Sequence, residues 1–319
     1  MEKRPETNPL VLDCVATNPA GEVVAEGCVE TTTPSEKMRF ALEELPKVQL
    51  RREDRFAVLL SKCEGLQAMP CAVAHPCSPD ALQGAIEAAE HQLISPILVG
   101  PEARIRAVAE EARVDLTRYR LVPTEHSHES AEVAVALVRS GEARMLMKGS
   151  LHTDELLSAV VNRTNGLRTA RRLSHCFVIA VPTYPRAIIV TDAAINIAPT
   201  LEEKVDIIQN AIELAHALGS SEPKVAILSA VETVTLKIPS TIEAGALCKM
   251  ADRGQITGGI LDGPLAFDNA ISAAAAKEKG IVSPVAGQAD ILVVPDLEAG
   301  NMLAKQLTFL GDADAAGIV

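Results

Sequence analysis

Short apolar runs alternate with helical segments along most of the chain, and this pattern constrains the fold more than any other feature. The apolar runs are rich in Val, Ile and Leu, as buried strands are, and lie at residues 56–60, 96–99, 145–147, 176–181, 187–190, 225–228, 256–261 and 291–294. Segments typical of helices lie between them, at residues 78–92, 101–113, 129–139, 200–219, 240–252, 269–279 and from 302 onward. Strands that alternate with helices predict an α/β fold with mostly parallel sheets.

Two further helix starts carry capping residues. Thr153 is followed by Asp154 and Glu155, so we expect Thr153 to cap a helix whose acidic first turn suits the helix dipole. Thr200 with Glu203 has the spacing of a capping box, which predicts the start of a long helix.

The first 54 residues differ from the rest of the chain. Two strand-like stretches at residues 10–15 and 22–29 are joined by a turn signal at 17–21, which predicts a β-hairpin. A charged segment follows and ends near residue 54. Because a lone hairpin is marginal in water, we interpret residues 1–54 as a piece of another domain plus a linker.

Composition and charge exclude several classes of protein. The chain has 319 residues, enough for two domains, and a net charge of -12, which argues against nucleic-acid binding because phosphates would be repelled. No apolar run is long enough to span a bilayer, and the first residues are not an apolar signal segment. The seven cysteines form no CxxC pair, so we expect reduced thiols, a cytoplasmic location and no zinc site.

Polar residues follow four of the predicted strands, where α/β sheets bind ligands. The four segments are KGSLHT at 148–153, TDAAIN at 191–196, DGPLAFD at 262–268 and PDLEAGN at 295–301. In the first, Ser150, Thr153 and the start of the next helix are suited to a phosphate, and His152 to proton transfer. The aspartates of the other segments are candidates for a base, a metal shell or simple helix caps, and these alternatives stay open.

The arginine-rich segment 162–172, NRTNGLRTARR, interrupts the alternation and is a candidate domain boundary. One interpretation is an exposed helix face. The other is an anchor for a polyanionic ligand such as the phosphates of a nucleotide. Segments with the motifs GxxxxGK[ST], GxGxxG and GxSxG are absent, which disfavours P-loop hydrolysis, classical dinucleotide binding and an α/β-hydrolase acyl-enzyme.

Five longer segments together resemble the phosphate acetyl/butyryltransferase family. They are MLMKGSLHTDELLSAVV, IVTDAAIN, KVAILSAVETV, KIPSTIEAGALCKMADRGQITGGILDGPLAFDNAIS and ADILVVPDLEAGNMLAKQL, and the resemblance covers residues 54–319. It implies transfer of an acyl group between coenzyme A and inorganic phosphate, with coenzyme A as a substrate and no cofactor. It also implies two α/β domains of isocitrate/isopropylmalate dehydrogenase-like architecture with the site in the interdomain cleft, and a homo-oligomer.

The resemblance also assigns the ends of the chain. Residues 10–37 look like the last strands of a MaoC-type hot-dog hydratase domain without its catalytic segment, so we expect no hydratase activity. Residues 55–170 would form the first transferase domain, residues 171–299 the second, and residues 300–319 would return to the first. The family continues a few dozen residues further, with a Ser-Arg pair and an Asp in that tail, so we expect a piece of a longer protein.

The expected reaction is direct attack of phosphate on acetyl-CoA or butyryl-CoA in a ternary complex. We assign Asp296, His152 and Asn301 as catalytic. The residues expected to bind substrate are Lys148, Ser150, Thr153, Asp192, Asn196, Asp262, Gly263, Asp268, Gly300, Arg171 and Arg172. Two alternatives remain: a catalytically incomplete piece that only binds CoA or oligomerises, and a metal-dependent decarboxylating dehydrogenase of the same architecture.

Overall fold

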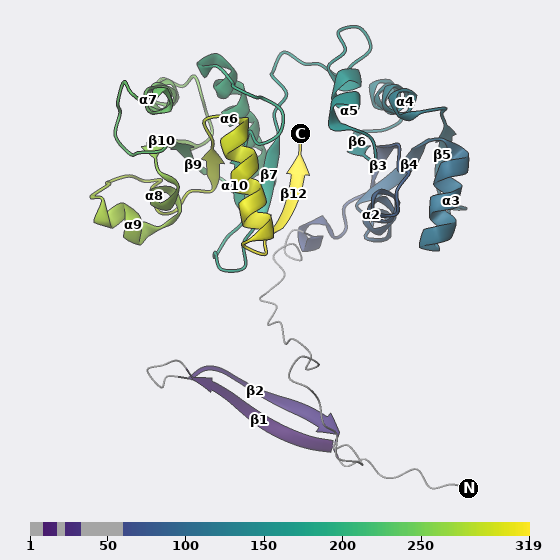
Figure 1. Cartoon of the computed structure of the whole chain (residues 1–319), viewed down its shortest axis with the longest axis horizontal. Coiled ribbons are helices and arrows are strands. Elements are labelled where there is room, and N and C mark those ends of the chain that lie inside the picture. Colours follow the sequence, from purple (N-terminus) through teal and green to yellow (C-terminus); the bar gives the residue numbers. More distant parts are fainter. Residues whose placement is uncertain (1–8, 18–22, 33–59) are drawn as a thin grey trace. The chain divides into compact units, whose positions relative to one another are not determined.

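The computed structural model describes residues 9–17, 23–32 and 60–319. The chain divides into two compact units, Met1–Arg51 and Arg52–Val319. In the first unit, β1 (Pro9–Thr17) pairs antiparallel with β2 (Val23–Thr32), which confirms the predicted hairpin (Figure 1). The residues between the two strands, the charged segment that follows and the first predicted strand of the α/β region, except its last residue, lie outside the described part of the chain.

A four-stranded parallel sheet begins the second unit. Its elements in chain order are β3 (Met69–Ala74), α2 (Pro79–Glu90), β4 (Ile94–Gly100), α3 (Glu102–Ala112), β5 (Arg120–Pro123), α4 (Ser127–Ser140), β6 (Met145–Lys148) and α5 (Thr153–Val160). The strand order is β5-β4-β3-β6. Strands β4 and β5 thus lie on one side of β3, and β6 lies on the other side. The strand order reverses between β3 and β6, so the carboxyl ends of these two strands form a topological switch point.

Alternate residues of β3 face two different helical layers. Cys71 and Val73 pack in one apolar cluster with α2 and α3, whereas Ala72 and Ala74 pack in another with α4 and α5. Because successive side chains of a strand point to opposite faces, helices cover both faces of this sheet. Figure 1 shows the four helices around the sheet.

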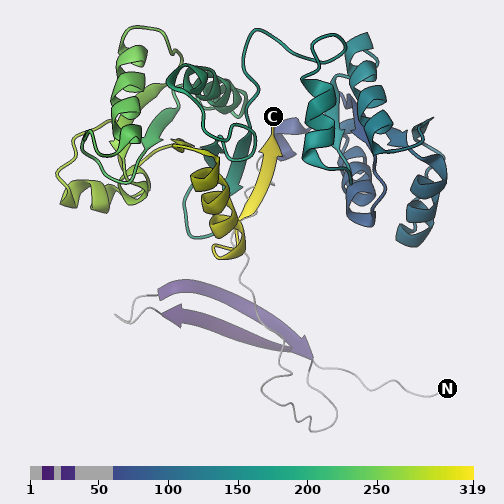
Figure 2. The same ribbon diagram turned by 45° about the horizontal axis from the view of Figure 1, so that its top comes forward.

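A six-stranded sheet forms the rest of the second unit. Its elements are β7 (Cys176–Ala180), β8 (Ile188–Thr191), α6 (Leu201–Ala217), β9 (Lys224–Leu228), α7 (Pro239–Asp252), β10 (Ile260–Leu265), α8 (Phe267–Ile271), α9 (Ala273–Glu278), β11 (Ile291–Val293), α10 (Leu297–Phe309) and β12 (Asp314–Ile318). The strand order is β10-β9-β11-β8-β7-β12. Strands β8 to β11 are parallel, whereas β7 is antiparallel to β8 and to β12 (Figure 2).

Two apolar clusters hold helices on the two faces of the larger sheet. Ile208 and Ile212 of α6 pack with Leu247 of α7 on one face. Ala270 of α8 and Ala304 of α10 pack on the other. The mixed α/β fold with parallel sheets that the sequence predicts is therefore confirmed. Within the described ranges, no helix combines the length and apolarity that crossing a membrane requires.

The end of the chain corrects the expectation that residues 300–319 return to the first sheet. Strand β12 pairs with β7 of the larger sheet, from Asp314 opposite Ala180 to Ile318 opposite Cys176. Helix α10 packs on the same sheet through Leu303, Ala304 and Leu307. The apolar side of α10 thus fixes where the following strand can pair.

Several element boundaries differ from the sequence prediction. Strands β3, β5 and β12 were not predicted. Strand β10 begins four residues after the start of the predicted 256–261 run, and the helix expected at 269–279 is broken into α8 and α9. The break falls at Ser272, whose backbone is extended and whose hydroxyl caps α9 by accepting from the Ala275 N–H at 3.3 Å. Serine competes with helix formation by such local bonds, which explains the break.

Candidate functional site

The turn after β8 is closed by the buried side chain of Asp192. Its Oδ1 accepts hydrogen bonds from the Ala194 and Ile195 N–H groups at 2.9 and 3.0 Å. Its Oδ2 accepts from Asn196, from the backbone N–H at 3.3 Å and from Nδ2 at 2.6 Å. Aspartate favours such turns because its carboxylate reaches the next N–H groups of its own chain. Asp192 therefore has its polar atoms committed to the turn.

Asp296 begins α10 as its N-cap residue. Its Oδ1 accepts a hydrogen bond from the Ala299 N–H at 2.9 Å, which satisfies one of the donors that a helix start leaves unpaired. The sequence left three roles open for this aspartate: a base, a metal ligand or a helix cap. The structure shows that it caps α10. The catalytic assignment of Asp296 stays a prediction.

Gly300 and Asn301 fasten α10 to the turn after β8. A Cβ on Gly300 would lie 2.8 Å from the carbonyl oxygen of Asp192 and 3.0 Å from Cα of Ala193, so only glycine allows this approach. Asn301 donates from Nδ2 to the carbonyl oxygen of Ala193 at 3.2 Å. Two of the predicted strand ends thus lie side by side, and their polar groups hold each other.

Ser150 connects the carboxyl ends of β6 and β3 at the switch point of the smaller sheet. Its hydroxyl donates to the carbonyl oxygen of His75 at 2.9 Å and accepts from the Cys77 N–H at 3.1 Å. Gly149, just before it, donates its N–H to the carbonyl oxygen of Ala74 at 2.8 Å. Both functions of the Ser150 hydroxyl, as donor and as acceptor, are therefore used within the protein.

Helix α5 begins at its predicted cap, which is one residue earlier than the sequence predicts. Thr153 is the first helical residue and His152 precedes it, so the prediction that Thr153 caps the helix is wrong by one position. The His152 N–H donates to Oε2 of Glu155 at 3.2 Å. Lys148 is exposed, and its Nζ lies 3.4 Å from the carbonyl oxygen of Gly149.

A buried histidine at the end of β3 was missed by the sequence analysis. His75 has a left-handed backbone, with φ 55°, and its Nδ1 lies 3.1 Å from Oγ of Ser130. Ser130 donates to the carbonyl oxygen of His126 at 2.8 Å, so it accepts from Nδ1–H of His75. Burial, and then the nearby Arg104 guanidinium, lower the pKa of His75, while Glu155 raises it. The neighbouring strand itself was not predicted, which is why this residue escaped notice.

Asp262, Gly263 and Asp268 lie at the far edge of the larger sheet. Three strand spacings, about 14 Å in all, separate β10 from β8 in the strand order. Oδ1 of Asp262 accepts from the Gly263 N–H at 2.9 Å, and Asp268 is exposed on α8. These residues do not join the turn after β8 or the start of α10.

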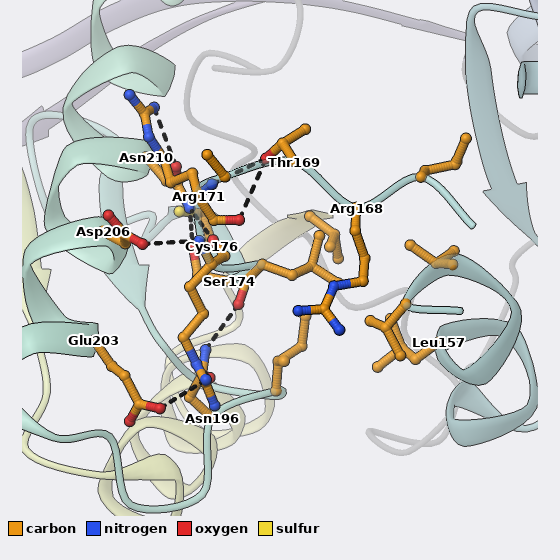
Figure 3. A pocket seen from close by; sticks show the side chains of 18 of the residues that line it. Leu157, Arg168, Thr169, Arg171, Ser174, Cys176, Asn196, Glu203, Asp206 and Asn210 are labelled. Carbon is orange, nitrogen blue, oxygen red and sulfur yellow. Dashed lines mark hydrogen bonds and ion pairs between the residues drawn. The ribbon is translucent and has the colours of Figure 1, made fainter. Parts of the chain in front are cut away.

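A cavity of about 1060 Å³ lies between α5 and α6, beside the start of β7 (Figure 3). One wall is apolar and is formed by Leu157, Val160, Val161 and Leu167. The opposite wall is polar and includes four carboxylates of α6, those of Glu202, Glu203, Asp206 and Glu213. Such a cavity suits an amphiphilic ligand with one apolar and one charged part.

Residues 168–172, which we call the arginine strap, cross the polar side of this cavity. Nη1 of Arg171 forms an ion pair with Glu213 at 2.6 Å and a hydrogen bond to Asn210 at 3.3 Å. The hydrogen bond that Arg171 donates to Glu213 raises the pKa of Arg171. The strap is therefore fastened to α6 at this residue.

Arg172 also binds the strap to α6. Its backbone N–H donates to Asp206 at 2.8 Å and its Nη1 pairs with Glu203 at 2.6 Å. Its Nε donates to Oδ1 of Asn196 at 2.5 Å, and Nδ2 of Asn196 donates to Asp192 and to the carbonyl oxygen of Leu173. A chain of hydrogen bonds thus runs from the cavity wall to the turn after β8.

Three of the predicted site residues line the cavity: Asn196, Arg171 and Arg172. The other predicted residues are not among those that line it. The structure therefore brings together the turn after β8, the start of α10 and the strap. Among the described residues, no hydrogen bond joins the predicted residues on β10 and α8, or those at 148–153, to this group.

Comparison with known proteins identifies the family of the chain. Residues 124–319 match the phosphate acetyl/butaryl transferase family, an overlap of more than half of the chain. The chain belongs to this family. Its similarity to a phosphate acetyltransferase of Rhizobium meliloti is 67% identity over 247 residues, covering 77% of this chain and 78% of the relative. A phosphate butyryltransferase of Clostridium beijerinckii is 40% identical over 264 residues, covering 83% of this chain and 87% of the relative.

The fold matches a solved structure of the same kind. A branched-chain phosphotransacylase from Enterococcus faecalis V583 superposes with a TM-score of 0.68 and 32% identity, covering 78% of this chain and 87% of that one. The resemblance inferred from the five sequence segments is therefore confirmed as membership of this transferase family. None of these matches supports the dehydrogenase alternative.

Proposed function

We propose that this protein catalyses the reversible reaction of an acyl-CoA with inorganic phosphate to give an acyl phosphate and CoA. Membership of the phosphate acetyl/butaryl transferase family, through the match over residues 124–319, carries this proposal. A phosphate oxygen bonds to the thioester carbonyl carbon and the phosphate gives up its proton to a protein group or to solvent. The C–S bond breaks, and the departing thiolate takes up a proton to give the CoA thiol. CoA is a substrate and no cofactor takes part.

The cavity beside α6 is the proposed binding place for the acyl-CoA. An acyl-CoA has phosphate groups at one end and an apolar acyl chain at the other, and the cavity has an arginine strap along one wall and apolar side chains of α5 along the other. Asn196 lines the cavity, but both hydrogens of its Nδ2 are donated to Asp192 and to the carbonyl oxygen of Leu173. We therefore propose that Asn196 positions Arg172, which donates to its Oδ1, beside the substrate.

Inorganic phosphate is proposed to bind near His152 and Thr153, at the start of α5, where helix N–H groups and the helix dipole favour anions. Because the Ser150 hydroxyl is used by its own protein partners, we propose that Ser150 shapes this loop. Asp296 and Asn301, at the start of α10, are proposed to orient the reacting groups, and Lys148 to attract anions. Direct attack requires both substrates to be held in line, which is the main contribution expected of such a site.

The remaining expectations are proposals of the same kind. We propose that the two α/β parts are domains of isocitrate/isopropylmalate dehydrogenase-like architecture with the cavity in their cleft, and that the hairpin is the last part of a hot-dog domain. We also propose a homo-oligomer in the cytoplasm. The free cysteines among the described residues, such as Cys176 and Cys248, are compatible with a reducing compartment.

The proposal is tested by measuring phosphate-dependent release of the CoA thiol from acetyl-CoA and butyryl-CoA. We expect release with at least one acyl-CoA, dependence on phosphate, and formation of the corresponding acyl phosphate. If the folded protein releases no thiol from either substrate, the proposed function is wrong. A parallel assay with NAD, a divalent metal and a hydroxy acid tests the dehydrogenase alternative.

The role of Asp296 is tested with a substitution that retains its cap. Asparagine is as good an N-cap as aspartate, so Asp296→Asn removes the charge with little effect on the helix. We expect kcat to fall by at least about tenfold if the carboxylate orients or accepts a proton. Glu298→Gln, an exposed carboxylate in the same helical turn, is the matched control. Equal rates for the two variants would show that Asp296 only caps α10.

A further inference from the structure

We propose that Arg168 is the residue that binds a phosphate group of the acyl-CoA, while Arg171 and Arg172 mainly hold the strap to α6. This inference rests on the proposed function, and it divides one arginine-rich segment into a ligand-binding residue and two positioning residues. Three observations on the cavity carry it.

The first observation is that two of the three strap arginines are already neutralised. Arg171 is paired with Glu213 and Arg172 with Glu203, both at 2.6 Å, and Arg172 is bound to Asn196 as well. A phosphate that approached either guanidinium group would meet the carboxylate already paired with it. Their positive charge is therefore largely unavailable to a ligand.

The second observation concerns Arg168 itself. Within residues 60–319, no ion pair and no side-chain hydrogen bond involves its guanidinium, although it lines the same cavity. Figure 3 shows its side chain extending into the space between Leu157 and the Glu203 side of the cavity. An arginine with five free N–H donors in a fork geometry matches two oxygens of a phosphate group.

The third observation is the charge of the surrounding wall. The cavity is lined by three arginines, Arg168, Arg171 and Arg172, and by the four α6 carboxylates named above, so the lining side chains carry a formal charge of −1. An anion is repelled from most of this wall and is attracted where an unpaired cation stands. The wall therefore directs a phosphate to Arg168.

The apolar wall selects the type of phosphate. Leu157 of α5 lines the same cavity as Arg168, together with the other apolar residues of that wall. Inorganic phosphate gains nothing from such a surface. A phosphate ester that continues into an apolar arm can bind the arginine at one end and cover the aliphatic side chains with the other.

The test is equilibrium binding, measured by titration calorimetry, of CoA, dephospho-CoA, pantetheine and inorganic phosphate. The proteins are wild type, Arg168→Gln, Arg168→Lys, and Arg253→Gln as an exposed control outside the cavity. We expect Arg168→Gln to weaken CoA binding by about tenfold or more, since a charge-assisted bond is lost. Arg168→Lys should weaken it less, and Arg253→Gln should match wild type. Dephospho-CoA shows whether the 3′-phosphate or the diphosphate is the group bound.

The other ligands decide whether the effect is specific. Pantetheine has no phosphate, so its binding should be the same in wild type and Arg168→Gln. Equal weakening of CoA and pantetheine would mean a structural effect, and CoA binding within twofold of wild type would show that Arg168 is not the anchor. Either result overturns the inference, as does a variant that weakens only inorganic phosphate.

Kinetics separate this inference from the proposed function. In the active protein, Arg168→Gln should raise KM for acyl-CoA by about tenfold, with kcat and KM for phosphate little changed. If wild type binds CoA through Arg168 but releases no thiol, the proposed function fails and the inference stands. If wild type is active and the variant keeps its KM, the inference fails alone.

Discussion

The turn after β8 and the arginine strap are both rich in polar residues, but they use them differently. In the turn, Asp192 and Asn196 are buried, and their polar atoms bind one another and nearby backbone groups. In the strap, Arg171 is exposed and paired with a carboxylate of another element, and Arg168 is left without a partner among the described residues. Polar residues that follow a strand are therefore no guide to a ligand unless their partners are known.

This difference predicts that substitutions in the turn change mainly the stability of the protein, whereas substitutions in the strap change mainly ligand binding. Removing a polar group from the turn leaves buried donors unpaired, which costs free energy of folding. Removing one from the strap exposes its partner to water, which costs little folding free energy but changes the charge that a ligand meets. The following experiments test that separation, beginning with the largest expected effect.

Asp192→Ala should be the most destabilising of these changes. It removes the acceptor for the N–H groups of Ala194 and Ile195 and for the Asn196 amide. We expect the free energy of unfolding to fall by at least about 3 kcal/mol, because the bonds are buried and charge-assisted. Urea denaturation measures it, with the exposed Asp268→Ala as control, expected within about 1 kcal/mol of wild type. Similar losses in both variants would contradict the distinction.

Gly300→Ala should have a smaller but clear effect. The added Cβ would lie 2.8 Å from both the Asp192 carbonyl oxygen and Cγ2 of Val294, so α10 must move away from the turn. We expect a loss of about 2 kcal/mol, typical of overpacking. In Gly84→Ala, within α2, the nearest atom to the new Cβ outside the neighbouring helix backbone is Cε of Met147 at 4.0 Å. That variant should gain about 0.5–1 kcal/mol from helix propensity. Thermal unfolding measures the stability of both variants. A Gly300→Ala variant as stable as wild type would contradict the close approach of α10 to the turn.

Glu213→Gln should increase the affinity for CoA. The change releases Arg171 from its ion pair and removes one negative charge from the cavity wall. We expect CoA to bind about two- to threefold more tightly, because an exposed pair contributes little and is screened by water. Arg171→Gln should weaken binding by no more than about threefold. Calorimetric titration measures both, and a loss as large as that expected for Arg168→Gln would show that Arg171 binds the ligand directly.

The free energy of unfolding should fall as the pH is lowered below the pKa of a free histidine. The pKa of His75 is lowered in the folded protein, mainly by burial, so the unfolded chain takes up a proton below about pH 6.5 that the folded chain does not. Stability is therefore retained above this pH and lost below it. His75→Asn, which tolerates the left-handed backbone, should lose less stability between pH 7 and 5.5.

His175 provides the comparison for that experiment. Its pKa is also lowered by burial, although the Asp192 carboxylate raises it, so part of the wild-type dependence should survive in His75→Asn. Urea denaturation at both pH values gives the two slopes. Identical slopes in wild type and His75→Asn would mean that His75 does not titrate differently in the folded protein.

Local patterns account for the parts of the fold that the sequence predicted well. The capping box of Thr200 and Glu203 is present, with the Thr200 N–H bound to Glu203 at 2.8 Å, because both partners lie within one helical turn. Strands β8, β9 and β11 were predicted from their continuous runs of β-branched and leucine side chains. Such signals depend only on neighbours in the chain.

Strands that depend on distant partners were missed. In β3, the sequence MPCAVA has a proline and small residues, and it is a strand because β4 and β6 pair on its two sides. In β12, Asp314–Ile318 is exposed throughout, and pairing with β7 makes it a strand. Neither segment has the apolar alternation that identifies a strand without its sheet.

The sequence alone determined the family, the α/β alternation and which segments follow the strands, since all of these are properties of neighbouring residues. The tertiary structure decided which of those polar groups remain available to a ligand. Arg172 meets Asn196 from 24 residues away, and Arg171 meets Glu213 from 42 residues away. Side chains so far apart in the chain bind each other only when packing brings their helices and loops together, and no local sequence pattern predicts such contacts.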